Sequence, residues 1–127
     1  MQQNYQFEYA VIRIVPKVER EEFLNVGVVL YCAKEKFLQL KYTINEERLK
    51  SFGCEMDIHE IKEYLHAFEQ ICLGNTHASP IAQLPIAERF RWLTATRSTV
   101  VQTSKVHPGL CNNANEMLIK IYEQQVL

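Results

Sequence analysis

The sequence lacks the patterns that place a chain in a membrane, in an oxidising compartment or around a structural zinc ion. No apolar run approaches the roughly 18 residues of a membrane span, and no basic segment followed by an apolar one opens the chain. The four cysteines include no Cys-x-x-Cys pair, so their spacing indicates no metal site. We therefore expect a reduced cytoplasmic protein with buried free thiols, no contact with membranes and no metal ligand.

Common catalytic motifs are also missing. The sequence has no G-x-S-x-G elbow, phosphate-binding P-loop, G-x-G-x-x-G or H-E-x-x-H. With 14 basic and 15 acidic residues the net charge is -1, so no overall field attracts nucleic acid. These absences make an enzyme less favoured than a binding protein, and we expect no catalytic residue and no cofactor. RNA binding is the third and least favoured function.

The length of 127 residues suits one domain over 1–127. β-branched and aromatic residues predict an antiparallel meander. In the first strand Phe7 and Tyr9 share one face while Ile12 and Ile14 share the other, which is typical of a strand covered on both sides. Asn25 and Gly27 could form a β-bulge, but a plain junction between turn and strand is the favoured interpretation; the functional alternative is that Gly27 lets a ligand or partner backbone approach. The expected strands are 7–15, 26–32 and 37–44, with 99–103 as a candidate fourth.

Helix caps and apolar periodicity predict the remaining elements. Asp57 with Glu60, and Asn113 with Glu116, form capping boxes at helix starts, and Pro85 fits the first position of a helix. The expected helices are 46–52, 57–73, 86–93 and a last one after Asn113; a strand over 89–95 competes with the third, and 107–109 is expected to be a turn. The fold class is α+β: an antiparallel three- to four-stranded sheet with three to four helices, one covering its face.

The segment 89–109 combines the only tryptophan with four basic residues and no acid. A guanidinium near hydroxyls fits phosphate or carboxylate geometry, so Arg97 indicates an anion site or a surface for an acidic partner. The favoured interpretation is nevertheless structural, with Arg97 paired to the acidic helix face at 60–69 or simply hydrated. Arg13 has two similar interpretations: an arginine that extends from a strand end to water, or a cation held over a pocket.

Two stretches carry a family resemblance. YAVIRIVP at 9–16 and EREEFLNVGVVL at 19–30 resemble the opening signature of a bacterial family of unknown function, DUF3037. FRWLTA at 90–95, RST at 97–99 and the pattern over 101–109 resemble its second signature. The family often has proline where this chain has Thr96 and Thr103. Members are often encoded beside HipA-like serine/threonine kinases, so the resemblance implies a kinase partner but no activity.

The function that we expect is a small non-enzymatic interaction or accessory module, with an oligomer left open. The alternative is an enzyme or binding protein for a phosphorylated or anionic small ligand, in which Arg91 and Arg97 clamp the charge, Glu22 is a base and Ser98 or His107 lies near the chemistry. The signature positions are our candidate binding residues: Arg13, Glu22, Asn25, Gly27, Arg91, Trp92, Arg97, Ser98, Gln102, Ser104 and His107.

Overall fold

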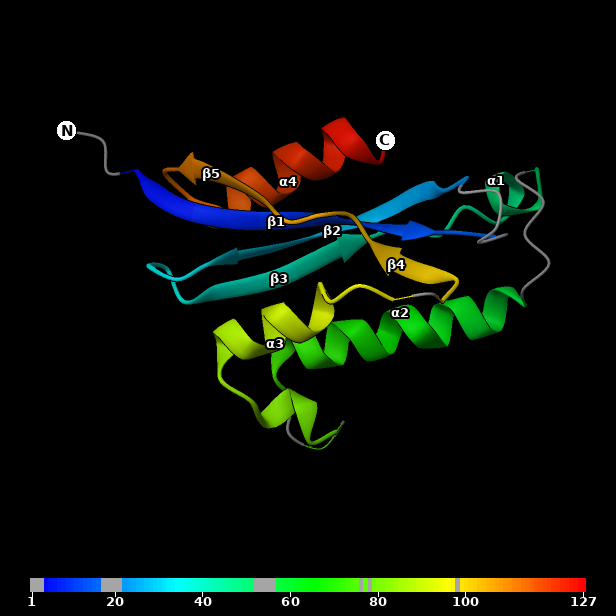
Figure 1. The fold of residues 1–127 in the computed structure, drawn as a ribbon. Helices are drawn as coiled ribbons and strands as arrows, with labels where there is room; N and C mark the ends of the chain where they lie inside the picture. The colour runs from blue at the N-terminus through cyan, green and yellow to red at the C-terminus, as the bar shows by residue number, and fades with distance from the viewer. Residues whose placement is uncertain (1–3, 17–21, 52–56, 76, 78, 98) are drawn as a thin grey trace.

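A twisted antiparallel sheet forms the middle layer of the protein (Figure 1). The computed structural model describes residues 4–16, 22–51, 57–75, 77, 79–97 and 99–127. Strands β3, β2 and β1 lie in that order, and both β4 and β5 pair with the far edge of β1. The strands are β1 (Tyr5–Ile14), β2 (Leu24–Cys32), β3 (Phe37–Tyr42), β4 (Val101–Thr103) and β5 (His107–Cys111).

The helices begin where the sequence places caps. Side-chain oxygens of Asn45, Asp57 and Asn113 each accept a hydrogen bond from a backbone N–H of the first helical turn, which satisfies a donor that the helix leaves unpaired. The helix over 86–93 is confirmed against the competing strand, and Pro85 directly precedes it. The helices are α1 (Glu46–Ser51), α2 (Ile58–Leu73), η2 (a 3₁₀ turn, Ile81–Gln83), α3 (Ile86–Leu93) and α4 (Ala114–Gln125).

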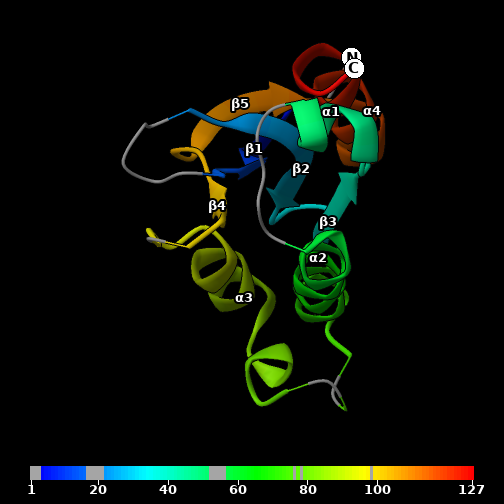
Figure 2. The ribbon, with the colours of Figure 1, turned by 90° about the vertical axis from the view of Figure 1, so that its right-hand side faces the viewer.

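Helices cover both faces of the sheet (Figure 2). Alternate residues of β1 face opposite sides: Ala10, Ile12 and Ile14 pack in the core beneath α2 and α3, whereas Phe7 packs in the core beneath α4. The prediction of a first strand covered on both sides is therefore confirmed. We expected one helix to cover the sheet, and the structure adds a second, α4, on the other face.

A β-bulge interrupts the pairing of β1 with β2. Ile12 lies opposite Gly27 and Arg13 opposite Asn25, so Val26 is the extra residue. A Cβ atom at Gly27 would lie 2.7 Å from the carbonyl oxygen of Lys41 in β3. The structure thus has the bulge in place of the plain junction that we favoured, and the backbone that approaches Gly27 belongs to this chain.

The far edge of the sheet corrects two expectations. The sheet has five strands because both β4 and β5 pair with β1, and the segment 107–109 is part of β5, not a turn. Pro108 is tolerated because an edge strand needs hydrogen bonds on one side only. Gly109 suits its place because a Cβ there would lie 2.5 Å from the ring of Phe7. Strand pairing with β1 has overridden the local turn preference of Pro and Gly.

Candidate functional site

The sheet separates the predicted site residues into two groups. Arg91, Trp92 and Arg97 lie on the side of α2 and α3, where Trp92 meets Phe68 of α2 with ring centroids 6.2 Å apart. Arg13 lies between two residues of the core beneath α2 and α3, so its side chain leaves the opposite face of the sheet. The candidate residues therefore do not all converge on one pocket.

Arg97 holds the C-terminal end of α3. Its Nη1 donates to the carbonyl of Leu93 at 2.8 Å and its Nη2 to that of Trp92 at 2.5 Å. The guanidinium also lies 4.5 Å from the ring centroid of Trp92 and 5.1 Å from that of Phe68. A cation at the end of a helix offsets the negative pole of the helix dipole, while burial lowers the pKa of Arg97. Within the described residues its partners are carbonyls and rings, not the carboxylates of 60–69.

Arg91 is engaged elsewhere on the same side. Its Nη1 lies 3.0 Å from Oε2 of Glu8 in β1, with 60% of the arginine side chain exposed. Both residues line a small pocket of about 140 Å³, together with Gln6 and Tyr31. Arg91 and Arg97 thus face different partners, which does not resemble a two-arginine clamp for one anion.

On the other face, three polar residues of neighbouring strands form a row. Arg13 of β1 lies opposite Asn25 of β2 and opposite Gln102 of β4; we call these three residues the Arg13 row. The Arg13 guanidinium stacks 3.9 Å from the ring centroid of Phe23, which is 44% exposed. Burial lowers the pKa of Arg13. The row therefore presents a stacked guanidinium between two amides.

Two buried atoms of this row lack partners. Nε of Arg13 and Oδ1 of Asn25 make no hydrogen bond within the part of the chain that the structure describes. The other amide groups of the row are used: Nδ2 of Asn25 donates to the carbonyl of Gln125, and Nε2 of Gln102 donates to that of Thr99. An unsatisfied buried polar atom costs about 1–3 kcal/mol, so a water molecule or a bound group is expected to meet this donor and acceptor.

A groove lies beside the Phe23 ring. Phe23, whose ring covers Arg13, also lines a groove of about 580 Å³ between the start of β2 and α1. Asn45, Glu47 and Arg48 contribute polar groups to its wall. An exposed aromatic ring between a guanidinium and an open groove is typical of a surface that binds another molecule.

Ser104 and His107 lie where β4 gives way to β5. The Ser104 hydroxyl accepts from the Val11 amide at 2.8 Å and donates to the Lys105 carbonyl at 2.9 Å, so it joins this interrupted edge to β1. His107 is exposed and its ring centroid lies 5.3 Å from that of Tyr9. Ser104 is therefore a structural residue of the edge, whereas His107 is accessible.

The remaining predicted residues are Glu22, Gly27 and Ser98. Glu22 is exposed just before β2, Gly27 is buried in the bulge, and Ser98 falls outside the described residues. Sequence reasoning missed Phe23, since no spacing in the sequence shows that its ring covers Arg13. It also missed three side chains of metal-ligand type that gather beneath α4: Cys32, Glu35 and Cys111.

Comparison with known proteins places the chain in a family. A family model described as "Protein of unknown function (DUF3037)" matches residues 9–126. The chain belongs to the DUF3037 family. No curated protein and no solved structure matches this DUF3037 chain. In the described residues, no helix has both the length and the apolar character needed to cross a bilayer. Family membership brings no activity with it, so a function must be argued from the geometry.

Proposed function

We propose that this DUF3037 chain is a non-enzymatic interaction module that binds an acidic segment of a protein partner at the Arg13 row. The observation that carries the proposal is the stacked guanidinium of Arg13, whose Nε has no hydrogen-bond partner in the described residues. A guanidinium offers paired donors that match a carboxylate in a bidentate arrangement. One carboxylate oxygen at Nε would satisfy the buried donor.

The surroundings favour a protein segment over a small ion. The exposed ring of Phe23 and the groove beyond it provide apolar and polar area next to the charge. Protein interfaces are enriched in aromatic residues and arginine, which often supply most of the binding energy. The partner that the family resemblance implies is a HipA-like kinase, and it is the first one to test.

The chemistry of the row favours binding over catalysis. Arg13, Asn25 and Gln102 provide positive charge and amide groups, but none of the three is a nucleophile or a base at neutral pH. A stronger case for an enzyme would need a nucleophile, a base and an orienting group in contact. The row supports recognition of a negative charge without a reaction upon it.

Isothermal titration calorimetry with a purified HipA-like kinase tests the proposal. We expect Arg13→Gln to weaken binding at least tenfold and Arg13→Lys to weaken it less, because lysine keeps the charge but loses the planar fork. Lys120→Gln, an equal charge change on the exposed side of α4, is the matched control and should bind as wild type.

The outcomes separate the parts of the proposal. If the Arg13→Gln variant binds the kinase as wild type does, the Arg13 row is not the interface. If the wild-type chain does not bind the kinase, this kinase is not the partner. The second candidate function, binding of a small anion, is favoured by the same unpaired Nε. Titration with inorganic phosphate, followed by NMR shifts at Arg13 and Gln102, would support that alternative if phosphate binds and the kinase does not.

A further inference from the structure

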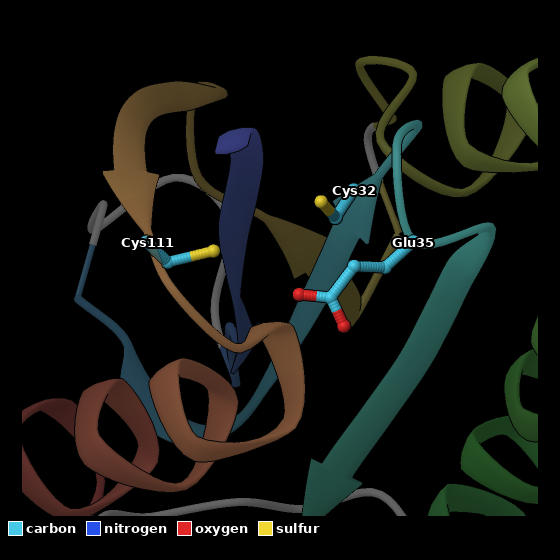
Figure 3. Close-up of side chains that lie close together, drawn as sticks. All are labelled: Cys32, Glu35 and Cys111. Carbon is cyan, nitrogen blue, oxygen red and sulfur yellow. The ribbon is translucent and has the colours of Figure 1, made fainter. Parts of the chain in front are cut away.

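Beneath α4, far from the Arg13 row, three segments bring metal-ligand side chains together (Figure 3). Cys32 is the last residue of β2, Glu35 lies in the turn between β2 and β3, and Cys111 is the last residue of β5. Their ligand atoms all lie within 4.8 Å of one another. In Figure 3 the three side chains point towards a common space beside the first turn of α4.

The donor set and its spacing fit a zinc ion. Zinc binds thiolate sulfur at about 2.3 Å and carboxylate oxygen at about 2.0–2.2 Å, so tetrahedral ligands lie about 3.5–3.8 Å apart. Small side-chain movements bring the present cluster to that spacing. Two thiolates also select a soft or borderline ion over magnesium or calcium, which prefer oxygen ligands.

The carboxylate is already positioned for this role. Oε1 of Glu35 accepts a hydrogen bond from the backbone N–H of Ala114 at 3.0 Å. A carboxylate has two oxygens, so this bond to the start of α4 leaves the other for a metal. Metal ligands commonly have such a second interaction, which fixes their orientation.

Binding of a metal ion would change the charges of the cluster. When a divalent ion binds, two metal–sulfur bonds form and two thiol protons leave to solvent, so two thiolates and one carboxylate face the ion.

A disulfide is the competing use of two neighbouring thiols, but the backbone opposes it. Strand β1 runs between β2 and β5, and two strand spacings amount to about 9.6 Å. A disulfide requires Cα atoms about 4.4–6.8 Å apart. A metal ion, which adds two bonds between the sulfurs, suits the wider separation.

We propose that Cys32, Glu35 and Cys111 form a zinc-binding site that joins the turn between β2 and β3 and the end of β5 to the start of α4. Three protein ligands leave the fourth position of the ion to water or to a ligand from a partner. The buried thiols close the inner side of the site, and Glu35 marks its exposed side.

Cobalt(II) tests the site because thiolate ligands give it an intense near-ultraviolet charge-transfer band. We expect the chelator-treated full chain to bind one cobalt ion with that band, and zinc to displace it. Cys32→Ala and Cys111→Ala should each abolish the band. Glu35→Gln should weaken binding at least tenfold while still accepting the Ala114 hydrogen bond. The variant Cys54→Ser with Cys72→Ser is the control for the remaining thiols and should keep the band.

Circular dichroism shows whether each variant is folded. If a cysteine variant unfolds, the Glu35→Gln variant, which changes an exposed side chain, provides the test of the site. The proposal is overturned by a folded wild-type chain that shows no thiolate–cobalt band. It is equally overturned by a band that Glu35→Gln leaves unchanged, or by one that disappears in the Cys54→Ser, Cys72→Ser control.

Discussion

Replacing Arg97 by alanine tests whether this arginine holds the fold or binds a partner. The structure predicts the first, because both terminal nitrogens donate to the last carbonyls of α3 and the guanidinium faces two aromatic rings. The alanine variant leaves these carbonyls without their charged donor and removes the cation–π contact between Arg97 and Phe68. We therefore expect a less stable protein that keeps the same fold.

The magnitude follows from the contacts that are lost. A hydrogen bond from a charged group contributes about 1.5–3 kcal/mol, a cation at a helix end about 0.3–1 kcal/mol, and a partly exposed cation–π contact about 0.5–1 kcal/mol. These terms overlap, and Arg97 is only half-buried, so we expect about 2–3 kcal/mol in all. For a chain of this length each kcal/mol corresponds to about 4 °C, so Tm should fall by about 8–12 °C.

Urea denaturation and thermal melting provide the measurement. Arg97→Lys should lose less, because lysine keeps the charge but not the fork. Arg91→Ala, which breaks the partly exposed ion pair between Arg91 and Glu8, should cost less than about 1 kcal/mol. The structural role is refuted if the free energy of unfolding of Arg97→Ala lies within about 0.5 kcal/mol of wild type. If that stable variant also loses partner binding, Arg97 belongs to the binding surface.

Three further changes test the fold. Burial, partly offset by Arg89, raises the pKa of Cys72 from 9.0 to about 12. The Cys72 contribution to the free energy of unfolding should therefore be full below pH 9 and fall by up to about 1.4 kcal/mol per pH unit between 9 and 12. Urea melts at each pH should show a smaller slope for Cys72→Ala than for wild type. Gly27→Ala should lower the unfolding free energy by about 1–3 kcal/mol, because its Cβ meets the backbone of β3; an unchanged urea midpoint would contradict the close approach. Ser104→Ala should cost about 1–3 kcal/mol by leaving the Val11 amide unpaired, whereas Ser104→Thr, which keeps the hydroxyl, should lose less in the same melts.

Much of the fold is local enough to predict from the sequence. Asp57 and Asn113 mark helix starts because a short side-chain oxygen next to apolar periodicity has few other uses. The faces of β1 follow from simple alternation. Strand β5 was not predictable in this way, since Pro108 and Gly109 favour a turn locally, and only the pairing of β5 with β1 makes them a strand.

The candidate site depends on contacts that are distant in the sequence. Arg13 and Gln102 become neighbours because β4 pairs with β1. The spacing of residues in the sequence does not predict that the Phe23 ring stacks on Arg13. The cysteine cluster is harder still. Cys32 and Cys111 come from different strands, so the absence of a Cys-x-x-Cys motif does not exclude a metal site of this kind.

The path of the segment 89–109 explains why its charges do not act together. It begins in α3 on one side of the sheet. There Arg91 forms an ion pair with Glu8 of β1, and Arg97 donates to the last carbonyls of α3. It then enters the edge of the sheet, where Gln102 joins Arg13 on the other face. A partner docked on the Arg13 row is therefore separated from Trp92 by the thickness of the sheet. Because the two groups contact different partners, a loss of binding in an α3 variant must be compared with its loss of stability before it is assigned to an interface.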